Sequence, residues 1–231
     1  MPKLIELPRL LAACYRVVGD GNLAAIKQLL DAGAGSLGGA RPKASVRDGG
    51  RLLIAKFSSL RDEWDVIAWE KAALDLAERA CITVPGRRLE RIAGRSVLLL
   101  DRFDRTPDGA RIPYLSAMSL FTTRMTTYAT TGFFGLMVAG PPSPEFDINP
   151  NPDIGVRREL AIGVGTDPAD EILALREVAP SSGVDRIVAE EILNEVFNAT
   201  RLWLECAGNN GLPARELRLM EDVFAPRFSL R

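Results

Sequence analysis

The fold is decided by residues 43–57, which read Lys-Ala-Ser-Val-Arg-Asp-Gly-Gly-Arg-Leu-Leu-Ile-Ala-Lys-Phe. Two strand-like runs, 43–47 and 52–57, flank Asp48-Gly49-Gly50, and this arrangement is typical of a tight β-hairpin. A second pair of strands is predicted over 89–92 and 96–100, around Ala93-Gly94-Arg95. Between the pairs, Asp62 is the predicted N-cap of a helix that runs to about Ala80. This order predicts an α+β lobe with an antiparallel sheet.

Helical patterns flank this lobe on both sides. Helices are expected over 7–18 and 23–30, and the region 115–140 shows no clear period apart from a predicted buried strand over 133–139. Prolines make 141–152 irregular. The tail is predicted to be helical again, with an apolar face over 184–203 and a last helix over 213–220. We therefore expect two domains, a sheet-containing lobe over 1–114 and a helical lobe over 115–231.

The composition excludes several classes of chemistry. The chain of 231 residues contains no histidine, which rules out Ser-His-Asp catalysis, Cys-His catalysis and His-ligated metals. Its three cysteines are scattered, which argues against a disulfide framework and favours a reducing, cytoplasmic location. A net charge of −1 and the lack of a long apolar run predict no direct nucleic-acid or membrane partner. The remaining chemistry must use carboxylates, lysine, arginine, hydroxyls and a hard metal such as Mg²⁺.

A glycine-dense segment, residues 33–43, is the first candidate for binding an anion. Its sequence is Gly-Ala-Gly-Ser-Leu-Gly-Gly-Ala-Arg-Pro-Lys. Glycines let backbone N–H groups approach an anion without a Cβ in the way. The segment lacks the Gly-Lys-Ser/Thr of a Walker A loop, and no strand precedes it as in a Rossmann turn. A flexible loop between lobes is the alternative reading.

Lys56 and Glu70 form the second candidate. Lys56 ends an apolar strand, where a buried ammonium needs a partner, and Glu70 lies beside the apolar stripe of the next helix. A strand lysine paired with a helix glutamate is how protein kinases hold the α- and β-phosphates of ATP. The alternative is a solvated lysine and a surface glutamate.

Two further segments carry carboxylates. Residues 99–105, Leu-Leu-Asp-Arg-Phe-Asp-Arg, run from an apolar strand into alternating charges, as a kinase hinge does beside adenine. The alternative is an edge strand that ends in surface ion pairs. Asp147 lies in the proline-bounded segment 144–150 and is a candidate Mg²⁺ ligand, because Mg²⁺ takes one or two carboxylates plus phosphate oxygens. A local Asx-turn is the alternative there.

The order of these parts resembles a protein kinase, and their sequences resemble the HipA family of serine/threonine kinase toxins from type II toxin–antitoxin modules. The likeness rests on residues 35–43, on Ile-Ala-Lys-Phe at 54–57, on Trp-Glu at 69–70, on Asp-Arg-Phe-Asp-Arg at 101–105 and on Phe-Asp-Ile-Asn-Pro at 146–150. It implies a protein-kinase-like HipA fold, with ATP and Mg²⁺ as cofactors and a HipB-like DNA-binding antitoxin as partner. The substrate is implied to be an unidentified protein.

The resemblance also implies individual roles for residues. The nucleotide would be bound by Ser36, Gly38, Gly39, Lys43, Lys56, Glu70, Asp101 and Phe103. Asp147 would hold Mg²⁺, and Ser36 would be a phosphosite whose autophosphorylation inhibits the kinase.

Two departures from the family's pattern set the functional expectation. The family begins with an N-terminal subdomain that this sequence does not contain. The family's Asn-x-Asp-x-His-x-x-Asn segment is also missing, since no Asp, Asn or His occurs between Ser116 and Phe146. Residues 130–136 resemble the join left by an internal deletion. Without the catalytic base and the second metal ligand, phosphoryl transfer is expected to be slowed by orders of magnitude. We therefore expect a truncated, internally deleted and impaired or inactive HipA-like kinase. The alternatives are a non-catalytic pseudokinase or partner-binding module, and a disrupted reading frame whose product folds only partly.

Overall fold

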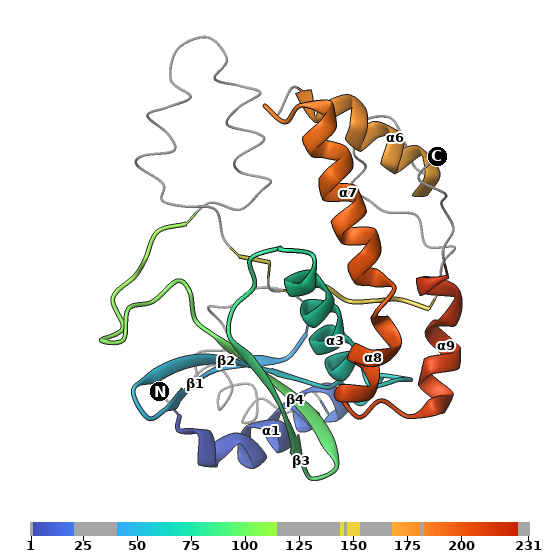
Figure 1. The fold of residues 1–231 in the computed structure, drawn as a ribbon. Helices are drawn as coiled ribbons and strands as arrows, with labels where there is room; N and C mark the ends of the chain where they lie inside the picture. Colours follow the sequence, from blue (N-terminus) through green and yellow to red (C-terminus); the bar gives the residue numbers. More distant parts are fainter. Residues whose placement is uncertain are drawn as a thin grey trace. The chain divides into compact units, whose positions relative to one another are not determined.

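The computed structural model describes residues 2–20, 41–114, 144–145, 147–152, 168–180 and 183–225 (Figure 1). By contacts, these residues fall into two compact units: unit 1 comprises 1–71 and 83–147, and unit 2 comprises 72–82 and 148–231. These limits differ from the predicted lobes 1–114 and 115–231, and the lobes remain a prediction.

Unit 1 is built on a four-stranded antiparallel sheet in the order β1-β2-β4-β3. The strands are β1 (Lys43–Asp48), β2 (Arg51–Phe57), β3 (Arg87–Ile92) and β4 (Arg95–Asp101). Both hairpins close with two residues, because Asp48 pairs with Arg51 and Ile92 pairs with Arg95. In the second turn Ala93 has φ 49° and Gly94 has φ 76°, the positive pair that a type I′ turn requires. The α+β class and the antiparallel sheet expected from the sequence are confirmed.

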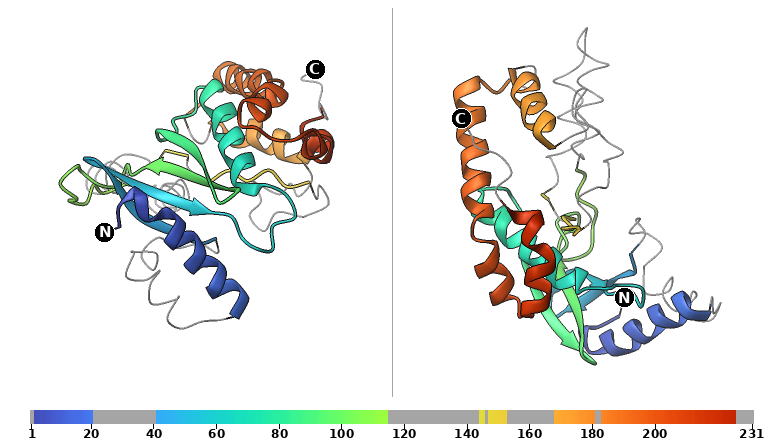
Figure 2. Two further views of the ribbon diagram at one scale, coloured as in Figure 1. Left: turned by 90° about the horizontal axis from the view of Figure 1, so that it is seen from below. Right: turned by 90° about the vertical axis from the view of Figure 1, so that its right-hand side faces the viewer.

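Helix α1 (Leu7–Asp20), preceded by the short 3₁₀ helix Leu4–Glu6, covers one face of the sheet (Figures 1 and 2). Successive strand residues point to opposite faces, so every second side chain meets α1. The resulting core contains Leu7, Leu10, Leu11, Ala13, Cys14, Ala44, Val46, Leu53, Ala55, Phe57, Val97 and Leu99. The intervening residues of each strand project from the other face of the sheet, and Lys56 is one of them.

Helix α3 (Val66–Arg79) begins three residues later than an N-cap at Asp62 would require. Its cap is Asp65, whose carboxylate accepts the Ala68 amide at 3.1 Å. Asp62 instead accepts the Ser59 amide at 2.7 Å. The sequence offers two aspartates for one cap, and the Asp62 prediction was wrong because that carboxylate closes the preceding turn.

Both edges of the sheet are protected, in different ways. At β1, the Arg47 amide donates to the Pro2 carbonyl at 2.9 Å, and the backbones of Lys3 and Arg47 form an isolated parallel β-bridge. Residues 2–3 therefore continue the sheet beyond this strand. At the other edge, β3 carries four charged side chains in Arg-Arg-Leu-Glu-Arg-Ile. Charged residues on an edge strand discourage pairing with a second chain.

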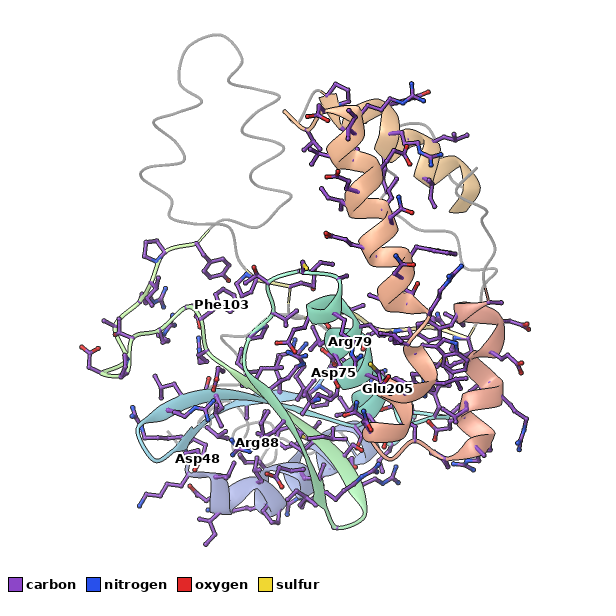
Figure 3. All side chains as sticks on the ribbon, viewed as in Figure 1. Asp48, Asp75, Arg79, Arg88, Phe103 and Glu205 are labelled. Carbon is purple, nitrogen blue, oxygen red and sulfur yellow. The ribbon has the colours of Figure 1, made fainter. Side chains whose placement is uncertain are left out.

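Unit 2 is helical in its described part. It contains residues 72–79 of α3 and the helices α6 (Pro168–Val178), α7 (Arg186–Thr200), α8 (Trp203–Asn209) and α9 (Ala214–Phe224). Arg79 donates to Glu205 at 2.6 Å and Asn210 donates to Asp75 at 2.8 Å, which ties α3 to the region of α8 (Figure 3). The predicted apolar face over 184–203 is wrong as one stripe. The chain turns after Thr200, and Val188 and Ile192 are 40% and 47% exposed.

In the described ranges, none of the helices combines the length and apolar character needed to cross a bilayer. Residues 23–30 and 133–139, for which a helix and a strand were expected, lie outside the described residues.

Candidate functional site

Lys56 is a buried ammonium paired with a buried carboxylate. It lies near the end of β2, on the face of the sheet away from α1, and its side chain is 4% exposed. Glu70, in the second turn of α3, is 0% exposed and accepts a hydrogen bond from the Lys56 ammonium. A buried charge is tolerated when a partner compensates it, so each residue makes the position of the other possible. The ion pair expected from the sequence is present; its role toward a nucleotide remains a prediction.

The Glu70 carboxyl is held in a strongly desolvated environment. Burial raises its pKa from an ordinary 4.5 to about 7, although the charges of Lys56 and Arg41 act in the opposite direction. Its Oε1 atom accepts the hydrogen bond from the Lys56 ammonium, while Oε2 is buried without a hydrogen-bond partner among the described residues. An unsatisfied buried oxygen is costly, and such groups gather at functional sites.

Asp147 provides a second carboxylate for the same ammonium. Its Oδ1 atom lies 3.2 Å from the Lys56 nitrogen, and its side chain is 53% exposed. The segment is anchored nearby, because the Glu145 amide donates to the Thr83 carbonyl at 2.9 Å and the Asp147 amide donates to the Glu145 carboxylate at 2.9 Å. Lys56 therefore stands between an enclosed carboxylate and one that faces solvent.

The beginning of β1 brings further cations to this end of the sheet. Lys43 is the register partner of Lys56, so the two side chains project from the same face. Arg41 donates to both oxygens of Asp62 at 2.9 Å. Arg41 is a site neighbour that sequence reasoning did not single out, since nothing in the pattern links it to Asp62. The predicted loop residues Ser36, Gly38 and Gly39 lie outside the described residues.

Asp101 is not brought together with Lys56. Alternation along β4 places its side chain on the α1 side of the sheet, where it forms an ion pair with Arg51. Gly86 packs against it so closely that a Cβ there would lie 2.2 Å from the Asp101 Oδ2 atom. The Asp101 carboxylate is therefore committed to a contact on the opposite face from the ion pair of Lys56 and Glu70.

The segment after β4 contains a network that sequence reasoning read only as alternating charge. Arg102, 5% exposed, donates to both oxygens of Asp104 at 2.8 and 2.6 Å and to the Ser45 hydroxyl at 2.7 Å. Desolvation raises the pKa of the Asp104 carboxyl, but hydrogen bonding and charge from Arg102, with the charge of Arg105, outweigh it and hold the pKa below 3.8. Phe103 lies within this network and meets Tyr114 edge-on, with ring centroids 4.9 Å apart. The signal available in the sequence was the i, i+2 spacing of opposite charges.

The donor set around Lys56 suits a phosphate-bound Mg²⁺ ion. No cluster of three or more Asp, Glu, Cys or His side chains that could hold a metal occurs in the described ranges, so a fully protein-ligated ion is not built there. Mg²⁺ needs fewer protein ligands, because it takes one or two carboxylates and completes its shell with phosphate oxygens and water. Asp147 offers one such carboxylate beside an ammonium that can bind phosphate.

Comparison with known proteins agrees with this architecture. Residues 35–140 match the HipA-like C-terminal domain family. A chain of the Shewanella oneidensis MR-1 toxin–antitoxin complex of HipA, HipB and operator DNA superposes with a TM-score of 0.52 and 15% sequence identity, over 81% of the present chain. A comparison with curated protein sequences gives no significant match.

Residues 35–140 are therefore similar to the HipA-like C-terminal domain, and the small antiparallel sheet with its helical part shares the fold of the HipA structure. The superposition covers 62% of the length of that solved chain.

Proposed function

We propose that this HipA-like protein binds ATP together with Mg²⁺ at Lys56, Glu70 and Asp147, and that it transfers phosphate slowly or not at all. The observation that carries the proposal is the arrangement around the Lys56 ammonium, with buried Glu70 on one side and half-exposed Asp147 at 3.2 Å on the other. Protein kinases use the same three kinds of group, a strand lysine, a helix glutamate and a metal-binding aspartate.

Each residue has a physical task in this proposal. Glu70 holds the Lys56 ammonium by a hydrogen bond, and phosphate oxygens take the place beside it that Asp147 occupies. Asp147 exchanges its contact with Lys56 for one with the metal ion that accompanies the phosphates. Bound Mg²⁺ supplies charge neutralisation of the phosphate oxygens.

Impaired transfer follows from the sequence. The interval between Ser116 and Phe146 contains no Asp, Asn or His, and so no residue of the kind that serves as base or second metal ligand in the Asn-x-Asp-x-His-x-x-Asn segment of related kinases. Positioning without a base forfeits a factor of about 10² to 10⁴ in rate. We therefore propose that nucleotide binding is retained. If phosphoryl transfer is lost completely, the protein is a non-catalytic pseudokinase.

The first test is a thermal melt of the full chain with ATP, with Mg²⁺ and with both. A ligand that binds only the folded state adds about 2.7 kcal/mol at a hundredfold excess over Kd, so a Mg²⁺-dependent rise in Tm is expected. Lys56→Ala alone is a poor control, because it leaves Glu70 buried without its counter-charge. The double variant Lys56→Met with Glu70→Gln removes both charges together.

Asp147→Asn should remove the Mg²⁺-dependent part of the rise. Asp108→Asn is its matched control, since Asp108 is an exposed carboxylate in a turn and hydrogen-bonds locally with Thr106. A cooperative melt with no shift under any condition would refute nucleotide binding and leave a partner-binding module. Transfer of labelled phosphate at a rate of about 1 per second, as in ordinary kinases, would refute the impairment.

A HipB-like antitoxin is proposed as a protein partner. Its support is the superposed relative, which comes from a complex of HipA with HipB and operator DNA. Co-purification of this chain with a co-expressed HipB-like protein is expected. Separate elution of the two chains at micromolar concentration would contradict the proposal.

A further inference from the structure

A cavity of about 280 Å³ lies within unit 2. Its walls come from the second half of α3 with the residues just after it, from the segment 148–150, and from the ends of α7 and α9. We propose that this cavity is a binding site for a small, uncharged, planar aromatic molecule, and that the bound molecule restrains residues 148–150, which follow Asp147. The inference stands apart from nucleotide binding, because Lys56 and Glu70 do not line the cavity.

The size of the cavity is unusual for the interior of a protein. Cores are packed so densely that few voids exceed a water molecule, and the side chains around a void lose attractive contacts. In another protein, an apolar cavity of roughly 150 Å³ stays dry and binds benzene. The present cavity is nearly twice as large and partly open to solvent, so it can take up an apolar body of about ten carbon atoms without local unfolding.

The lining of the cavity favours an uncharged ligand. None of the described residues around it carries a charge, and Asn149 and Thr200 are its polar members. The Thr200 hydroxyl donates to the Phe197 carbonyl at 2.8 Å and is therefore engaged within its own helix. A charged group that entered these surroundings would lose its hydration and gain no counter-charge. Carboxylates, sulfonates and ammonium ions are therefore disfavoured, whereas a neutral molecule is not.

Two of the walls favour a flat ring over a flexible chain. Ala73, Ala77 and Ala80 follow one another at i, i+4 and i+7 along α3 and its last turn, so they share one face and present short side chains. Phe224 adds an aromatic wall, and its ring stacks on Trp203 with centroids 5.1 Å apart and 9° between the planes. Aromatic rings attract one another in offset-stacked or edge-on contacts, and a rigid ligand loses less conformational freedom on binding.

The segment 148–150 connects the cavity to Asp147. Ile148 and Pro150 line the cavity, and one peptide bond joins Ile148 to Asp147. A ligand in contact with this segment is lost whenever the segment opens, so binding stabilises the closed backbone by mass action. Protection of residues 147–151 against hydrogen exchange should therefore rise when the cavity is occupied.

The test uses naphthol as a neutral two-ring probe, naphthol sulfonate as its charged counterpart and octanol as an aliphatic probe. Binding to the full chain is measured by calorimetry. Ala77→Leu and Val196→Phe fill the cavity from α3 and from α7, and Val196 is only half-buried, so the larger ring can be accommodated. Ala214→Leu is the matched control, because Ala214 is exposed at the start of α9 and does not line the cavity.

Naphthol should bind the unaltered chain and Ala214→Leu alike, with a Kd on the order of 100 μM. The sulfonate should bind about tenfold more weakly or worse, and so should naphthol to the two cavity-filling variants. Equal binding of naphthol and its sulfonate, tighter binding of octanol, or undiminished affinity in a filling variant that melts cooperatively would overturn the proposal. Binding that adds no protection to residues 147–151 would do so as well. The comparison of ligands on the unaltered chain decides the matter even where both filling variants fail to fold.

Discussion

Lys56 shows how a single side chain can be fixed by its surroundings and still remain available. Its side chain is buried on the face of the sheet away from α1. Its ammonium contacts Glu70, which is buried, and Asp147, which faces solvent. A buried ion pair adds little net stability compared with a well-packed apolar pair. We therefore interpret this pair as serving a binding site rather than stability.

The pH dependence of stability should reveal Glu70. Its folded pKa of about 7 lies above the ordinary 4.5, so the folded protein binds the proton more tightly than the unfolded chain. The stabilising contribution is fully present below pH 4.5 and is lost as the pH rises to about 7. Between these limits the free energy of unfolding of the unaltered protein should fall relative to Glu70→Gln, by on the order of 3 kcal/mol.

Urea denaturation of both proteins at several pH values measures this difference. The amide of Glu70→Gln does not titrate, so the subtraction isolates the one carboxyl. A difference that stays flat, or that grows in favour of the unaltered protein with rising pH, would show that Glu70 remains ionised throughout.

Sequence reasoning at the residue scale found contacts within a known pattern and missed contacts between segments. The pairing of Lys56 with Glu70 could be anticipated, because a lysine at the end of an apolar strand needs a partner on the following helix. Asp101 and Phe103 were predicted together, yet strand alternation sends the Asp101 side chain to the opposite face. Arg41 with Asp62 and Arg102 with Ser45 join segments whose proximity exists only in the folded chain.

At the scale of single elements, the start of α3 depends on one aspartate with three tasks. Asp65 caps the helix through the Ala68 amide, accepts the Ser96 hydroxyl and pairs with Arg91 at 2.9 Å. Asp65→Ala should lower the free energy of unfolding by about 2–3 kcal/mol, because it removes the cap and leaves Ser96 without its acceptor.

Asp185→Ala is the matched control for this cap. Asp185 accepts the Val188 amide at 3.0 Å at the start of α7 and is itself exposed, so its loss should cost only about 1 kcal/mol. Chemical denaturation gives both values. Equal losses in the two variants would mean that the sheet contacts of Asp65 contribute nothing.

The turn between β3 and β4 contains a residue whose backbone suits another side chain better. Ala93 has φ 49°, a left-handed conformation that costs an alanine about 1 kcal/mol and that asparagine adopts more readily. Ala93→Asn should therefore raise the free energy of unfolding by about 0.5–1 kcal/mol. Gly94→Ala, at φ 76°, should lower it, and a stabilised Gly94→Ala variant would contradict this account.

Sequence patterns predicted the elements of the sheet better than the helices. All four strands were expected within two residues of their limits, because turn residues bracket each one and apolar residues fill the runs. The break between α7 and α8 was missed. Apolar residues on both sides of it continue a helical period although the chain turns there. The start of α3 was misplaced, because two aspartates compete for one cap and only the fold decides between them.

At the scale of the whole molecule, α3 belongs to both units. Its residues 66–71 group with unit 1 and its residues 72–79 group with unit 2. Helix formation is cooperative along a chain, so loss of one part destabilises the other. We therefore expect the two units to unfold together.

Hydrogen exchange in increasing denaturant tests this coupling. Peptides from β2 and β4 report on unit 1, and peptides from α8 and α9 report on unit 2. Both sets should lose protection at the same denaturant concentration. Earlier loss in α8 and α9, with β2 still protected, would show that α3 does not link the units. Ala72→Pro, placed within α3 where unit 2 begins, should reduce protection in both sets.

The two sheet edges make this protein's tendency to aggregate depend on very few residues. The charged side chains of β3 discourage strand pairing at that edge, whereas at the β1 edge, in the part of the chain that the structure describes, residues 2–3 lie against Arg47. Removal of those residues uncovers backbone groups that can template another strand, as in amyloid growth. Fibrils nucleated along β1 at high protein concentration are then the expected consequence of such trimming.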